Sequence, residues 1–149
     1  MQYKSDPRHN SRVLALQKLF QKEFKQRHLQ ADEGISLYTE ESIIEINELG
    51  SFDNDLTNQL VDQMPTYQNE IDEIIKDLAP EWPIENIAFM DLLILRLAIL
   101  EGFILKKTPQ KVVINEAIEL TKDFCNEQTR KFISGVLGTL YTNQDKYLK

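Results

Sequence analysis

Cysteine, glycine and proline are all scarce in this chain. The single cysteine, Cys125, excludes an internal disulfide and favours a reducing compartment. It is not part of a CxxC pair, and with only two histidines, His9 and His28, no metal site is indicated. We interpret Cys125 as a small core or boundary residue. Five glycines and five prolines in 149 residues are few, as is typical of a helical protein.

The sequence also lacks a signal peptide and a convincing membrane span. No apolar stretch follows the charged N-terminus. The most apolar stretch, 84–105, carries Glu85, Asp91, Arg96 and Glu101. Charges near the centre of a spanning helix cost roughly 2.5–3.5 kcal/mol each. We therefore expect a buried core helix there, no membrane partner and a cytoplasmic location.

No catalytic motif is present either. The sequence has no GxSxG, no P-loop, no GxGxxG and no HExxH. Neither an enzyme nor a cofactor is therefore predicted.

The net charge of −7 argues against sequence-independent clamping of a nucleic-acid backbone, which needs clustered lysines and arginines. A local basic surface is still compatible with this charge, and an acidic body can recruit a basic protein partner.

Helical periodicity covers nearly the whole chain and predicts an all-α fold. Asn10 or Ser11 should cap the helix expected at 11–27, Pro65 should end the helix at 53–64, and Thr129 should cap the helix at 129–142. A connection is expected at 28–39. The apolar spacing predicts helices at about 11–27, 40–49, 53–64, 67–78, 85–105, 109–124 and 129–142.

Arg96 is a polar residue inside an otherwise apolar helix. A buried guanidinium needs a partner, and Glu101 or Glu116 could provide it. The expected result is a buried pair that locks two central helices. Gly135 and Gly138 are unusual inside the last helix, where glycine weakens a helix by about 1 kcal/mol relative to alanine. They predict close packing against another helix, or space cleared for a partner.

The segment TRKF (129–132) could bind phosphate. At a helix start, Thr129 would offer a hydroxyl and free backbone N–H groups, and Arg130 and Lys131 would offer two cations. Phe132 beside them could stack on a base of single-stranded RNA, although phenylalanine at this spacing is also typical of a core.

A second basic group begins at Lys4, Arg8 and Arg12 and continues along the first predicted helix through Lys18 and Lys22. These residues could line a phosphate track or form a solvated helix face.

Three segments carry a resemblance to a known family: ILRLAILEG (94–102), VVINEAIELTK (112–122) and TRKFISGVLGTL (129–140). Together they resemble the C-terminal half of the NusB family of bacterial transcription antitermination factors. A weaker likeness covers 11–24. Between 28 and 80 only the helical pattern agrees. The resemblance implies a compact NusB-like bundle of about seven helices. It also implies a single RNA-binding domain, 1–149, whose first ten residues form a flexible arm.

The resemblance also implies a function without catalysis. Members of this family bind boxA RNA together with NusE, a ribosomal small-subunit protein. The pair helps the RNA polymerase antitermination complex resist termination, notably during ribosomal RNA synthesis. The family's RNA-binding positions, with the N-terminal basic residues, correspond to Lys4, Arg8, Arg12, Arg130, Lys131 and Phe132. Its NusE-facing positions correspond to Glu85, Asp91 and Phe20, the last where tyrosine is common.

This chain departs from the family pattern at several positions. Its N-terminal arm has no run of arginines, Gln128 lies where aspartate is common, and Ser134 and Gly138 replace asparagine and aspartate. Fewer phosphate contacts would weaken RNA binding. One alternative is therefore an interaction module of NusB fold that has lost RNA binding. Another is the NusB-like domain that precedes RNA cytosine methyltransferases, although we expect no cofactor-binding unit here. A homodimer also stays open.

Overall fold

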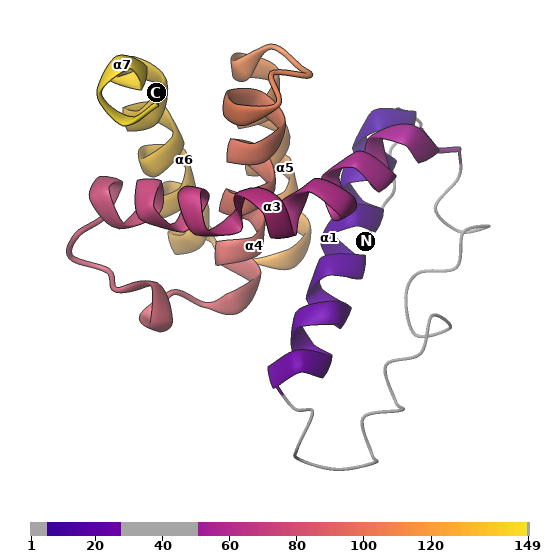
Figure 1. The fold of residues 1–149 in the computed structure, drawn as a ribbon, viewed down its shortest axis with the longest axis horizontal. Helices are drawn as coiled ribbons and strands as arrows, with labels where there is room; N and C mark the ends of the chain where they lie inside the picture. Colours follow the sequence, from indigo (N-terminus) through magenta and orange to yellow (C-terminus); the bar gives the residue numbers. More distant parts are fainter. Residues whose placement is uncertain (1–5, 28–50, 149) are drawn as a thin grey trace. The chain divides into compact units, whose positions relative to one another are not determined.

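The computed structural model describes residues 6–27 and 51–148, in two compact units, Met1–Asp62 and Gln63–Lys149. The described residues form six α-helices, one 3₁₀ turn and one π-helical segment, with no strand among them (Figure 1). The predicted all-α class is confirmed. The helix expected at 40–49 and the connection at 28–39 lie outside the described residues.

Helix α1 of the first unit spans Pro7–Arg27. The carboxylate of Asp6 accepts a hydrogen bond from the N–H of Arg8 at 3.0 Å, and proline follows at the first helical position. Asp6 is therefore the cap, and the predicted cap at Asn10 or Ser11 is wrong. The apolar residues of α1 that are buried are Val13, Leu14, Ala15, Leu16 and Leu19.

Ser11 instead joins α1 to the start of the next helix. Its hydroxyl oxygen accepts a hydrogen bond from the N–H of Asp53 at 2.7 Å. The hydroxyl of Thr57 donates to the Ser11 carbonyl oxygen at 3.0 Å. The carboxylate of Asp53 accepts the N–H of Leu56 at 3.2 Å and so caps that helix. These bonds satisfy the buried hydroxyl groups of Ser11 and Thr57 at this junction.

Helix α3 runs without interruption over Asn54–Leu78, with Pro65 inside it. The prediction of two helices separated at Pro65 is wrong. A proline costs a helix interior about 3 kcal/mol. Here one apolar stripe continues in register on both sides of the proline, and its burial favours a continuous helix. The buried stripe consists of Leu56, Leu60, Met64, Ile71, Ile74 and Ile75.

The helix expected at 85–105 is divided in the structure. A 3₁₀ turn, η3, covers Ile84–Asn86, and helix α4 covers Phe89–Ile99. Between them Ile87 and Ala88 have extended backbone, with ψ of 130° and 138°. Hydrophobicity did not reveal the break, because Ile84 and Ile87 are still half-buried. Every residue from Leu92 to Ile99 is buried, as expected of a central helix.

The π-helical segment η4, Leu100–Ile104, follows α4 directly. Helix α5 then spans Gln110–Phe124 after Pro109, as predicted to within one residue. Gly102 allows η4 and α5 to approach closely, because a Cβ at Gly102 would lie 3.1 Å from the Cβ of Val113. Lys106, with φ of 51°, ends this stretch in the left-handed conformation.

Helices α4, α5 and α6, the last over Glu127–Thr142, pack against one another in the second unit (Figure 1). A four-residue helix, α7, follows at Gln144–Tyr147. No atom outside the helix backbone lies within 4 Å of a Cβ built at Gly135 or Gly138. The predicted close packing of these glycines is therefore wrong, and space for a partner stays a prediction.

Arg96 of α4 is paired, but neither expected carboxylate is the partner. Its Nε and Nη2 donate to the two carboxylate oxygens of Asp72 on α3 at 2.8 and 2.9 Å. The predicted buried pair between two helices exists, and its partner was predicted wrongly. None of the helices within 6–27 and 51–148 is both long enough and apolar enough to cross a bilayer.

Candidate nucleic-acid interface

The turn between α5 and α6 positions most of the predicted RNA-side residues of the second unit. Cys125 has extended backbone there, and Asn126 is the N-cap of α6. The side-chain oxygen of Asn126 accepts a hydrogen bond from the N–H of Thr129 at 2.9 Å. The predicted cap at Thr129 is wrong, because an asparagine three residues earlier captures its N–H group. Arg130 and Lys131 consequently lie beyond the first helical turn.

Asp91, in the first turn of α4, contacts the turn between α5 and α6. The hydroxyl of Thr129 donates to the Asp91 carboxylate at 3.0 Å. Burial and the neighbouring Asp91 carboxylate, which accepts a hydrogen bond from the thiol, raise the pKa of Cys125 from 9.0 to about 12. The hydroxyl and the N–H group of Thr129, which were expected to help bind phosphate, thus already have protein acceptors.

An aromatic pocket opens beside the same turn, with a volume of about 430 Å³. Trp82 and Phe132 form an edge-to-face pair on it, with ring centroids 6.0 Å apart. Trp82 is 53% exposed, which is unusual for so large an apolar side chain. No lysine or arginine lines this pocket, which is completed by Asn86, Ile87, Ala88, Asp91, Asn126, Gln128 and Thr129. It therefore suits a flat, uncharged group.

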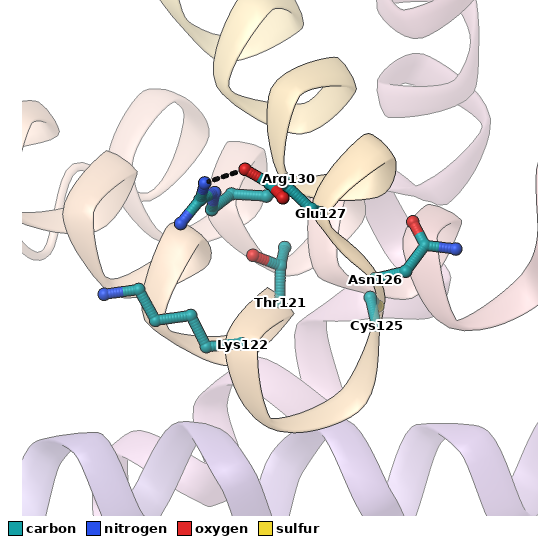
Figure 2. Close-up of a pocket in the computed structure, with 6 residues that line it drawn as sticks. All are labelled: Thr121, Lys122, Cys125, Asn126, Glu127 and Arg130. Carbon is teal, nitrogen blue, oxygen red and sulfur yellow. Dashed lines mark hydrogen bonds and ion pairs between the residues drawn. The ribbon is translucent and has the colours of Figure 1, made fainter.

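A smaller cationic pocket of about 300 Å³ lies around the end of α5 and the start of α6 (Figure 2). Lys122 of α5 and Arg130 of α6 border it, and Figure 2 shows their charged ends extending toward the same side. Arg130 donates to Glu127 at 2.9 Å, and Lys122 donates to Glu119 at 3.1 Å. Asn126 lines both pockets, so the two are neighbours.

The predicted RNA-side residues that the structure describes belong to both compact units, Met1–Asp62 and Gln63–Lys149. Phe132 lines the aromatic pocket, Arg130 borders the cationic pocket, and Lys131 is exposed on α6. Arg8 is exposed in the first turn of α1. Arg12 is only 5% exposed, which counts against direct contact with RNA. Lys4 lies outside the described residues.

The predicted partner-side residues lie on three different elements, α1, η3 and α4. Asp91 lies in the aromatic pocket with Phe132, so the structure combines residues expected on two different surfaces. Glu85 is exposed in η3. Phe20 is half-buried and stacks on Phe24, with ring centroids 6.2 Å apart.

Sequence reasoning missed three residues of this site. These residues are Trp82, Lys122 and Asn126, to which no functional role was assigned from the sequence. The one available signal was the position of Trp82 between Pro80 and Pro83, because a short turn rarely buries a whole indole. Among the residues 6–27 and 51–148, no group of three or more potential metal ligands gathers.

Comparison with known proteins decides the family. A sequence model of the NusB family matches residues 9–142. The chain belongs to the NusB family. The transcription antitermination protein NusB of Chloroflexus aggregans is 34% identical over 137 residues, which cover 91% of this chain and 87% of that protein. Its counterpart from Staphylococcus epidermidis is 36% identical over 133 residues, covering 89% and 97%. The predicted resemblance is confirmed.

Solved NusB structures share the fold. T. maritima NusB superposes with a TM-score of 0.72 at 26% identity, covering 94% of each chain. A crystal structure of the antitermination factors NusB and NusE with double-stranded RNA gives a TM-score of 0.67 at 24% identity, covering 90% of this chain and 95% of that one. The NusB-like all-α fold predicted from the sequence is thereby confirmed.

Proposed function

We propose that this chain is a transcription antitermination factor that binds boxA-like single-stranded RNA together with NusE. In this role it helps the RNA polymerase complex resist termination, above all in ribosomal RNA operons. The function needs no catalysis and belongs in the bacterial cytoplasm. Family membership supports the proposal, as does the solved complex of a NusB of the same fold with NusE and RNA.

The adjacent aromatic and cationic pockets carry the proposal. Proteins that bind single-stranded nucleic acid combine aromatic side chains, on which the bases stack, with cationic side chains that contact the phosphate backbone. The aromatic pocket offers Trp82 and Phe132, and the cationic pocket offers Arg130. Asn86 and Gln128 add exposed amide groups that can hydrogen-bond a base edge.

Lys131 and Arg8 are proposed as further phosphate contacts, because both side chains are exposed. Only a few such contacts are available on a chain of net charge −7, so RNA binding by the chain alone should be weak and its salt dependence shallow. A basic NusE surface would be attracted to Glu85 and would add affinity.

Fluorescence anisotropy of a labelled boxA-like RNA tests the proposal. The chain is titrated alone and with NusE, and a scrambled RNA is the control. We expect tighter binding with NusE that is lost on scrambling. Phe132→Leu should weaken binding about tenfold, since stacking on one aromatic is worth about 1–3 kcal/mol per base. The emission of Trp82, the chain's one tryptophan, should change on binding.

Absence of binding with and without NusE, by a chain that is folded by circular dichroism, would contradict the proposal. It would favour an interaction module that has kept the fold and lost the RNA.

A further inference from the structure

The cationic pocket contains a residue that the proposed RNA site has not yet used. Lys122 comes from α5 and Arg130 from α6, and the two side chains border one hollow of about 300 Å³ (Figure 2). Two cations on neighbouring helices can share one anion that neither could hold as tightly alone. The hollow is open to solvent, so an anion can enter it without displacing a helix.

The existing ion pairs of these two cations are weak. The Lys122 and Arg130 side chains are 51% and 38% exposed, and each pairs with a glutamate three residues away on its own helix. Such surface pairs contribute about 0–1 kcal/mol. A phosphate that reaches both cations at once can therefore replace the two glutamates. Cys125 adds no opposing charge, because the raised pKa of its thiol keeps it neutral at physiological pH.

The position of this hollow next to the aromatic pocket indicates which anion it holds. Asn126 lines both, so a ligand can occupy the two at once. One pocket has two aromatic rings and no lysine or arginine, and the other has one of each cation. A single-stranded nucleic acid presents the same alternation of flat, uncharged base and charged phosphate along its length.

We propose that Lys122 and Arg130 together hold one phosphate of the RNA strand whose base stacks in the aromatic pocket, which makes Lys122 an RNA-binding residue. This inference rests on the proposed function. It extends the proposed RNA-binding surface from the start of α6 to the end of α5. The strand then passes Asn126 between its base contact and its phosphate contact.

The experiment compares charge-neutralising variants of the full chain, with NusE, at several salt concentrations. The variants are Lys122→Gln, Arg130→Gln and the double variant. The matched control is Lys76→Gln, because Lys76 is 56% exposed and also pairs with a glutamate three residues away, Glu73. RNA affinity is measured by fluorescence anisotropy, and folding is checked by circular dichroism.

We expect Lys122→Gln to weaken RNA binding about twofold to tenfold, and Lys76→Gln to leave it unchanged. The slope of log affinity against log salt should fall by about 0.7 in the double variant, the value for one phosphate contact on a single strand. The two single losses should not multiply in the double variant, because both cations contact the same phosphate.

Two results would overturn the inference while leaving the proposed function intact. One is normal RNA binding by the wild type, with Lys122→Gln indistinguishable from Lys76→Gln. The other is a Lys122→Gln variant that loses affinity for NusE and keeps its affinity for RNA, which would make the hollow a protein-binding site. If the wild type itself binds no RNA, the proposed function fails, and the inference fails with it.

Discussion

Arg96 and Asp72 form a bidentate ion pair between α4 and α3 of the second unit. Nε and Nη2 of Arg96 lie 2.8 and 2.9 Å from the two carboxylate oxygens of Asp72. The Arg96 side chain is 5% exposed and the Asp72 side chain 20%. Nη1 of Arg96 has no hydrogen-bond partner, so Asp72 provides the compensation for this buried charge.

Removal of the Asp72 carboxylate should therefore destabilise the protein strongly. Asp72→Ala leaves the Arg96 guanidinium buried without a counter-ion, and we expect the free energy of unfolding to fall by about 3–5 kcal/mol. The double variant Asp72→Leu with Arg96→Met should recover most of this loss, because it removes both charges. Urea unfolding measures both. A loss under about 1 kcal/mol in Asp72→Ala would contradict this prediction.

The sequence predicts local structure better than it predicts partners. Apolar spacing located α1, α5 and α6 to within a few residues, because each buries one continuous face. The same spacing could not indicate that Pro65 lies inside α3, because tertiary packing opposes the local cost of proline.

The sequence pattern could not predict which residues contact one another between helices. Asp72 is 24 positions from Arg96, and nothing in the sequence ranks it above the closer Glu101 or Glu116. Similarly, Asn126 and Thr129 are both good caps, and only the folded turn shows that Asn126 caps and that Thr129 bonds to Asp91. The site was thus predicted as residues of the last helix, and its two pockets became visible only in three dimensions.

Cys125 should make stability depend on pH in the alkaline range. Its pKa is raised from 9.0 to about 12 in the folded protein, chiefly by burial and then by Asp91. Between these values the folded state holds a proton that the unfolded state has lost, so stability falls as pH rises. The contribution of the protonated thiol to the free energy of unfolding is complete below about pH 9 and is lost as pH approaches 12.

Urea unfolding at a series of pH values tests this, with Cys125→Ala as the control that lacks the titrating group. The difference in unfolding free energy between wild type and variant should shrink above pH 9. At pH 8 the thiol should also react slowly with a thiol reagent in the folded protein and quickly in urea. Equal rates in the two states would show that Cys125 is not protected.

Gly135 and Gly138 should tolerate alanine. No atom outside the helix backbone lies within 4 Å of a Cβ at either position, so the new methyl group meets no obstacle. Alanine favours a helix more than glycine does, and it restricts the unfolded chain more. Each substitution should therefore raise the free energy of unfolding by about 0.4–1 kcal/mol. If the open space accommodates a partner, the stabilised variants will bind NusE or RNA less tightly. A drop in stability would mean that the face is already packed.

Asn126 should separate the stability of the site from its affinity for RNA. Its side chain caps α6 through the N–H of Thr129, so Asn126→Ala should cost about 1 kcal/mol in unfolding free energy. Asn126→Asp and Asn126→Ser keep a capping oxygen and should nearly retain wild-type stability. The aspartate, however, places a negative charge between the aromatic and cationic pockets, both of which Asn126 lines.

RNA affinity should therefore fall in Asn126→Asp and be retained in Asn126→Ser, although the two variants are equally stable. Coulomb repulsion between the new carboxylate and a phosphate a few ångströms away is worth about 1 kcal/mol near a protein surface, or several-fold in affinity. This loss should grow as the salt concentration falls, because screening weakens. Equal RNA affinities of the aspartate and serine variants at low salt would mean that no phosphate passes Asn126, and the strand would have to follow another path across α6.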